Sequence, residues 1–162
     1  MAKRVVRLRG PRPGDMGRVV ALHGELYARE FGYNAEFEAL VAEIAAGFVR
    51  DFDANRERCW IADMEGEFVG SVFLVNQSKK IAKLRLLILH PKARGLGLGR
   101  RLTQACIRFA REKGYKKMVL WTQSHLAAAR AIYKAEGFRK TASEKHRSFG
   151  KNLLAETWER ML

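Results

Sequence analysis

A glycine-rich segment at residues 94–99, Arg-Gly-Leu-Gly-Leu-Gly, is the part of the sequence best suited to binding an anion. A predicted strand precedes it and a predicted helix follows it, so backbone N–H groups and the positive end of a helix dipole converge there. The P-loop pattern GxxxxGK[ST] is absent, and the spacing GxGxG does not fit the Rossmann pattern GxGxxG. The segment therefore predicts a phosphate site of another kind, with a plain tight turn as the alternative.

The charge distribution points to the same region. The net charge is +14, yet residues 1–81 contain twelve bases and twelve acids, so the whole excess lies in residues 82–162. Between Glu67 and Glu112 there are ten bases and no acid. This pattern predicts a polyanionic partner, with a solvated basic surface as the alternative.

The elements around the segment follow from hydrophobic periodicity. Residues 5–9 alternate as a strand does, and two helices follow, one with Asp15 as its N-cap and ending at Gly32, the other with Asn34 as its N-cap. Strands are predicted at 59–63, 66–77 and 82–90, forming an antiparallel meander. After the glycines come a helix to Gly114, a strand at 116–122, a helix at 126–136 and strands at 138–146 and 153–161.

This order predicts one domain over residues 1–162. The fold class is α/β (α+β), with a mixed, mainly antiparallel sheet of about six or seven strands flanked by about four helices on both faces. The two cysteines, Cys59 and Cys106, have neither disulfide-scaffold nor zinc-site spacing, so no metal is expected. No segment has the apolar length of a membrane helix or a signal peptide, and we expect a cytoplasmic protein with no membrane partner.

Two stretches together resemble the GNAT superfamily of acyl-CoA-dependent N-acetyltransferases. Arg94, Gly97 and Gly99 match its Arg/Gln-x-x-Gly-x-Gly/Ala signature, and Leu89 and Pro91 match the lead-in. A downstream Tyr-x-x-x-Gly-Phe, at residues 133–138, strengthens the match. The chain is also similar to the acetyltransferase halves of proteins that carry a MarR-type DNA-binding domain.

The resemblance implies acetyl-CoA as cosubstrate. Loop N–H groups would hold its diphosphate, and a strand that splays at a bulge would offer backbone groups to the pantetheine arm and the thioester carbonyl. The implied cofactor-binding residues are Leu87, Ile88, Leu89, Arg94, Gly95, Leu96, Gly97, Leu98, Gly99 and Arg100. Leu126 stands where the family often has Asn, so Ser124, Thr122 or Gln123 is expected to replace that contact. Arg100, Arg101 and Arg130 are candidates for the 3′-phosphate.

Tyr133 matches the family's general acid, which would protonate the departing thiolate. A phenol with a pKa near 10 is protonated at neutral pH, as a proton donor must be. The alternative is an aromatic side chain that only packs between its helix and the sheet. We expect a reduced rate, and not complete loss, when this hydroxyl is removed.

The general base is the main departure from the family. Lys83 and Arg85 stand where many members carry a Glu, which leaves Glu25, Glu30, His23, His90 or a chain of waters as substitutes. Lys83 and Arg85 would project from one face of their strand, either into the acceptor cleft or into solvent. In the cleft they would suit an anionic substrate, together with polar groups of residues 22–33 such as Tyr27.

The expected function is therefore transfer of the acetyl group of acetyl-CoA, by direct attack, to a small amine that carries a carboxylate. The alternative is a binding module without turnover, either an acyl-CoA sensor or a nucleic-acid-binding protein. The sequence lacks zinc-finger, RRM and recognition-helix motifs, which argues against a nucleic-acid partner. Members of the family are frequently dimers, so a homodimer is an expectation as well.

Overall fold

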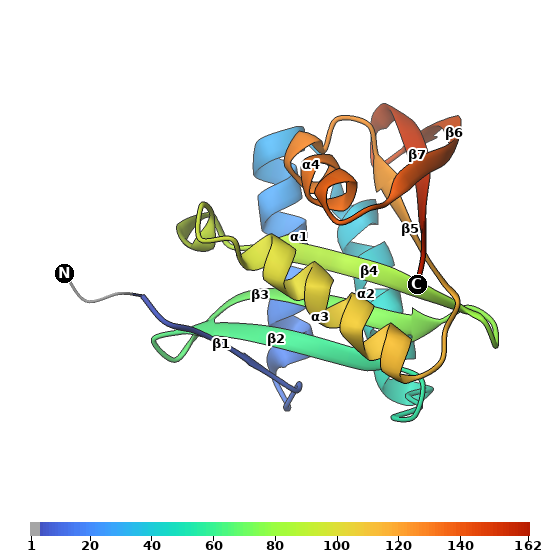
Figure 1. Cartoon of the computed structure of the whole chain (residues 1–162). Helices are drawn as coiled ribbons and strands as arrows, with labels where there is room; N and C mark the ends of the chain where they lie inside the picture. Colours follow the sequence, from blue (N-terminus) through green and yellow to red (C-terminus); the bar gives the residue numbers. More distant parts are fainter. Residues whose placement is uncertain (1–3) are drawn as a thin grey trace.

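A computed structural model describes residues 4–162 and shows a single sheet with helices on both faces (Figure 1). Within these residues the seven strands follow the order β1-β2-β3-β4-β5-β7-β6. The strands are β1 (Val6–Arg9), β2 (Arg58–Met64), β3 (Glu67–Asn76), β4 (Ile81–Leu89), β5 (Lys117–Gln123), β6 (Arg139–Ser148) and β7 (Lys151–Met161). The helices are α1 (Asp15–Phe31), α2 (Ala35–Arg50), α3 (Leu98–Glu112) and α4 (Ala127–Ala135), with a short 3₁₀ turn at Pro91–Ala93.

The predicted antiparallel meander is confirmed. β2 pairs with β3, and β3 with β4, in antiparallel register, and β4 with β5 is the one parallel pair among the described strands. The expected fold class is therefore correct. Residues 1–3 of the expected domain lie outside the described residues.

Two hydrophobic clusters hold the layers together. Behind the sheet in Figure 1, α1 and α2 bury Val19 and Val41 against Phe73 of β3. In front, α3 buries Leu102 and Cys106 against the opposite face, in a larger cluster that also receives α4 and β7. Both faces of the sheet are therefore covered by helices, and β4 is its middle strand.

The start of α1 differs from the prediction. Gly14 is the N-cap, with φ of 99° and no side-chain cap, while Asp15 is the first helical residue. The Asp15 carboxylate is fully buried and accepts hydrogen bonds from the Arg9 guanidinium, at 2.7 and 3.0 Å, and from the backbone N–H of Arg12. Arg9 also pairs with Asp63 of β2, so Asp15 anchors α1 to the sheet instead of capping it. The prediction of Asn34 as N-cap of α2 is confirmed, since its side chain accepts from the N–H of Glu36.

Candidate active site

The central feature of the site is a gap in the sheet between β4 and β5. In the described residues these strands pair only from Ile81–Lys117 to Leu84–Leu120, although both continue beyond that point. Opposite β3, the register of β4 shifts between Ser71 and Phe73, and Leu86 takes a φ of 52°. This is the geometry of a β-bulge, which bends the strand and ends its regular pairing. Residues 87–89 therefore have no β5 partner on that side.

The glycine-rich segment forms the turn from β4 into α3. Gly95 and Gly97 have φ of 78° and 73°, values that side chains disfavour. Gly97 is the N-cap of α3 and supplies no side-chain hydrogen bond, so the first N–H groups of the helix are free to bind an anion. Gly99 serves packing instead, because a Cβ there would lie 2.5 Å from Cδ1 of Ile132 in α4.

A groove of about 600 Å³ runs over this turn, between α1 and the start of α4. It contains nine of the predicted cofactor residues: Leu87, Ile88, Leu89, Arg94, Gly95, Gly97, Leu98, Gly99 and Arg100. Two others lie outside its lining. Leu96 is half exposed on the outside of the turn, and the N–H of Ser124 bonds to the carbonyl of Leu154 in β7.

The arginines near the groove are already paired. Arg94 bridges to Glu30 of α1 at 2.5 Å, and Arg100 bonds to Glu136 at the end of α4 at 2.9 Å. Arg101 donates to the carbonyl of Val6, and Arg130 bonds to the buried Glu156. Of the three arginines predicted to bind the 3′-phosphate, only Arg100 lines the groove.

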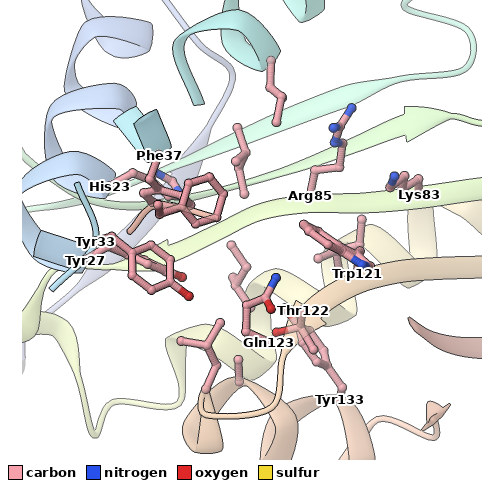
Figure 2. A pocket seen from close by; sticks show the side chains of 17 residues that line it. His23, Tyr27, Tyr33, Phe37, Lys83, Arg85, Trp121, Thr122, Gln123 and Tyr133 are labelled. Carbon is pink, nitrogen blue, oxygen red and sulfur yellow. The ribbon is translucent and has the colours of Figure 1, made fainter. Parts of the chain in front are cut away.

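A second pocket, of about 150 Å³, lies on the other side of the gap (Figure 2). It brings together Lys83, Arg85, Tyr27 and Tyr133, the residues predicted to bind or protonate the reactants. The two cavities share four lining residues, namely Tyr27, Leu87, Leu126 and Ala129, so they adjoin at the gap. Thr122 and Gln123 line this pocket and not the groove.

The pocket is electrically positive. Among residues 4–162, it is lined by Lys83 and Arg85 and by no Asp or Glu. Burial lowers the pKa of Arg85, and burial together with the nearby Arg85 lowers the pKa of Lys83. Neither cation has a carboxylate partner in the described lining of this pocket, although Arg85 also lines a neighbouring cavity that contains Glu43, Asp51 and Glu57. In Figure 2 they extend from β4 on one side, while Tyr27 and Tyr33 point their hydroxyls into the pocket from the other.

Tyr133 is buried and packs edge-on against Phe138, so its packing role is real. No side-chain hydrogen bond within residues 4–162 involves its hydroxyl, which leaves that group unengaged in the pocket wall. Burial raises the pKa of Tyr133 well above its ordinary value, and burial likewise raises the pKa of Tyr27 to about 12. Both phenols stay protonated at neutral pH.

The four candidate bases are widely separated. Glu25 lies in other cavities, Glu30 is paired with Arg94 in the groove, and His90 caps the 3₁₀ turn through the N–H of Lys92. Only His23 lines the acceptor pocket. Tyr33 falls within residues 22–33, which were predicted to contribute polar groups, and it lines the pocket from the loop after α1. The sequence did not single it out, because its partners are distant in the chain and leave no local pattern.

Comparison with known proteins identifies the family to which the chain belongs. The profile of the acetyltransferase (GNAT) family matches residues 23–138, and the chain belongs to this family. Among solved structures, the fold is similar to a putative phosphinothricin N-acetyltransferase, with a TM-score of 0.80, 19% identity and coverage of 97% and 98% of the two chains. It is also similar to a putative acetyltransferase from Salmonella typhimurium solved with its cofactor acetyl-CoA, with a TM-score of 0.77, 17% identity and coverage of 97% and 94%.

The alignments with curated relatives cover only part of each protein. Human N-acetyltransferase 8B is 32% identical over 87 residues, covering 51% of this chain and 38% of that protein. Mycothiol acetyltransferase of Amycolatopsis mediterranei is 28% identical over 128 residues, covering 70% and 40%. The chain thus spans less than half the length of these relatives. Within residues 4–162, every helix is too short or too polar to cross a membrane.

Proposed function

We propose that this domain transfers the acetyl group of acetyl-CoA to the amine of a small substrate that carries a carboxylate. The observation that carries the proposal is the junction of two different cavities at one gap in the sheet. One has a helix N-terminus suited to a diphosphate, and the other has two cations and, in the described residues, no acid. The acetyl-CoA bound to the Salmonella typhimurium neighbour supports the cofactor.

The residues suggest a sequence of steps. The N–H groups around Gly97 and the start of α3 would hold the diphosphate, and backbone groups of residues 87–89 would pair with the pantetheine arm and polarise the thioester carbonyl. The neutral amine attacks the carbonyl carbon, and the carbon–sulfur bond of the tetrahedral intermediate then breaks. Tyr133 gives its proton to the departing sulfur, so that CoA leaves as a thiol, and the positively charged nitrogen of the new amide returns a proton to the Tyr133 oxygen.

Arg85 and Lys83 would select the acceptor. Their partly buried charges have no carboxylate partner in the described lining of this pocket, and a substrate carboxylate would supply one with charge-assisted hydrogen bonds. The same cations would repel a substrate whose other end is positively charged. A carboxylate-bearing amine therefore fits this pocket better than a polyamine.

The test is release of free thiol from acetyl-CoA with amino acids, their decarboxylated amines and lysine peptides as acceptors. We expect the carboxylate-bearing amines to react best. Arg85→Gln should lower kcat/KM for them by about 10- to 100-fold, as for loss of a hydrogen bond to a charged group. The matched control is Arg29→Gln, on the exposed surface of α1 outside both cavities, which should have little effect.

The alternative is an acyl-CoA sensor, which the absence of an acidic base in the described pocket keeps open. Calorimetric binding of acetyl-CoA without thiol release by any acceptor would favour the sensor and contradict the transferase. Absence of acetyl-CoA binding would contradict both.

Three finer expectations stay predictions of this proposal. They are the similarity to acetyltransferase domains that accompany MarR-type domains, a cytoplasmic location and a homodimer. Analytical ultracentrifugation of the purified chain tests the last of these directly.

A further inference from the structure

The proposed transfer leaves one chemical requirement unmet, which is the removal of a proton from the acceptor. An alkylamine with a pKa of about 10.4 is only about 0.04% unprotonated at pH 7. In the described residues, the acceptor pocket contains no carboxylate to take this proton. The imidazole side chains that line the two cavities are His23 and His125.

His23 is poorly suited to accept the proton. Its Nδ1 lies 2.8 Å from the carbonyl oxygen of Val19, which can only accept, so Nδ1 carries the proton of the neutral ring. The ring is 2% exposed and stacks on Tyr27, and burial lowers its pKa to about 4. A proton taken up by Nε2 would create a buried cation without a counter-ion or a path to water.

Tyr33 and His125 form a different arrangement at the same junction. The Tyr33 hydroxyl lies 2.6 Å from Nε2 of His125, although the two residues are 92 positions apart. Tyr33 lines the acceptor pocket and His125 lines the cofactor groove, so this hydrogen bond connects the two cavities. Figure 2 shows the Tyr33 hydroxyl directed into the pocket.

The surroundings suit a relay. Tyr33 is 4% exposed and is held by Tyr27, Phe37 and Phe149, whereas His125 is an exposed residue in contact with water. Burial raises the pKa of Tyr33, so its phenol is protonated and donates to Nε2 of a neutral imidazole.

The groups around His125 leave it neutral near pH 7. Phe31 and Tyr33 pack against its ring, and the charged residues of the same groove are Glu30 and Arg94, which pair with each other, and Arg100, which pairs with Glu136. The ring is covered on one part of its surface by these aromatic neighbours, and this partial burial lowers the pKa of His125 below 6.5. The imidazole is thus free to accept a proton at neutral pH.

We propose that Tyr33 and His125 relay the acceptor's proton to solvent, an inference that rests on the proposed acetyl transfer. The ammonium N–H bond breaks and its proton passes to the Tyr33 oxygen, while the original Tyr33 proton passes to Nε2 of His125. The resulting imidazolium releases its proton to water, and the amine lone pair attacks the thioester. No oxidant or further reactant is required.

The experiment is the pH profile of kcat/KM for the best alkylamine acceptor, in wild type, Tyr33→Phe and His125→Gln. In wild type the profile should reach a plateau above the pKa of His125. Both variants should be slower by about 100-fold near pH 7, the lower end of general-base effects. Their rates should then rise about tenfold per pH unit as the free amine becomes abundant.

Two comparisons separate a proton relay from a structural role. Tyr115→Phe makes the same chemical change at a hydroxyl that bonds to Arg56 and Asn76, outside both cavities, and should keep the wild-type profile. The double variant of Tyr33 and His125 should be no slower than either single variant, because either substitution alone already interrupts the same proton path. Acetyl-CoA binding by calorimetry checks that each variant is folded.

Variants with the wild-type profile shape, whether or not their rates are lower, would overturn the relay while leaving the transferase intact. If Tyr33→Phe does not fold, His125→Gln decides the question alone. Absence of acetyl transfer to any amine in wild type would instead refute the proposed function and the relay with it.

Discussion

At the scale of single residues, the Tyr133 hydroxyl is the group with the most direct consequence for rate. We predict that Tyr133→Phe lowers kcat by about 100-fold, the lower end of general-acid effects, with an unchanged affinity for acetyl-CoA. Because burial raises the pKa of Tyr133, its loss of a proton should not limit the wild-type rate below about pH 10. Steady-state kinetics and calorimetry on both proteins measure these effects. An equal loss of cofactor binding would indicate that the side chain only packs.

His23 should make the protein sensitive to acid. Its pKa is lowered from 6.5 to about 4 by burial, so below pH 6.5 the unfolded chain takes up a proton that the folded chain does not. Its contribution is complete above pH 6.5 and is lost as the pH falls toward 4, by about 3 kcal/mol in total. We therefore predict that His23→Gln shows a shallower fall of unfolding free energy across this window, measured by urea denaturation.

The matched control for His23 is His90→Gln, at a partly buried position outside both cavities. It removes a histidine without altering the buried site of His23, so it tests whether the change in slope belongs to that site. Groups such as Asp15, whose lowered pKa affects stability below about pH 3.8, are common to all three proteins and cancel in the comparison. Equal slopes for His23→Gln and wild type would show that His23 is not the group responsible.

At the scale of elements, the bulge in β4 depends on its close contact with β3. A Cβ at Gly70 would lie 2.7 Å from the carbonyl oxygen of Ile88, a backbone atom beside the cofactor groove. We predict that Gly70→Ala lowers the unfolding free energy by about 1–3 kcal/mol, as overpacking does, and weakens acetyl-CoA binding by shifting β4. Denaturant unfolding and calorimetry measure the two effects.

Gly17→Ala is the control, and we expect it to change the unfolding free energy in the opposite direction. Gly17 lies inside α1 and has no positive φ, and a Cβ added there would meet no atom within 4 Å. Alanine at this position should stabilise the protein by about 0.5–1 kcal/mol without changing cofactor binding. Wild-type stability and affinity in Gly70→Ala would mean that β3 and β4 can separate without cost.

At the scale of the whole molecule, the unequal charge of the two halves should govern cofactor affinity. The +14 excess lies in residues 82–162, which include the groove turn and α3. Because salt screens charges beyond about 10 Å at 0.1 M and beyond about 3 Å at 1 M, we predict that the Kd for acetyl-CoA rises severalfold over that range. S-acetylpantetheine, which lacks the phosphates, should bind with little salt dependence. Equal salt dependence of the two ligands would contradict an electrostatic contribution from the phosphates.

Much of the fold could be predicted from the sequence because it depends on neighbours in the chain. The alternation of residues 59–90 and the turns between them determine the meander, and Asn34 caps α2 through a residue two positions away. Asp15 shows where this reasoning fails. Its carboxylate is taken by Arg9, which also holds Asp63 from a strand 54 residues further along, and no local pattern reports such an ion pair.

The glycine turn, its place between strand and helix, and the tyrosine of α4 are local patterns, and the sequence alone determined them. Which cavity each side chain enters was decided by the tertiary structure. The meeting of Lys83 and Arg85 with Tyr27 and Tyr133 requires the gap where β4 leaves β5. Likewise, Tyr33 reaches His125 only because α1 and the end of β5 approach the same junction. Contacts between residues that are distant in the chain form only when whole helices and strands pack together, so no local sequence pattern predicts them.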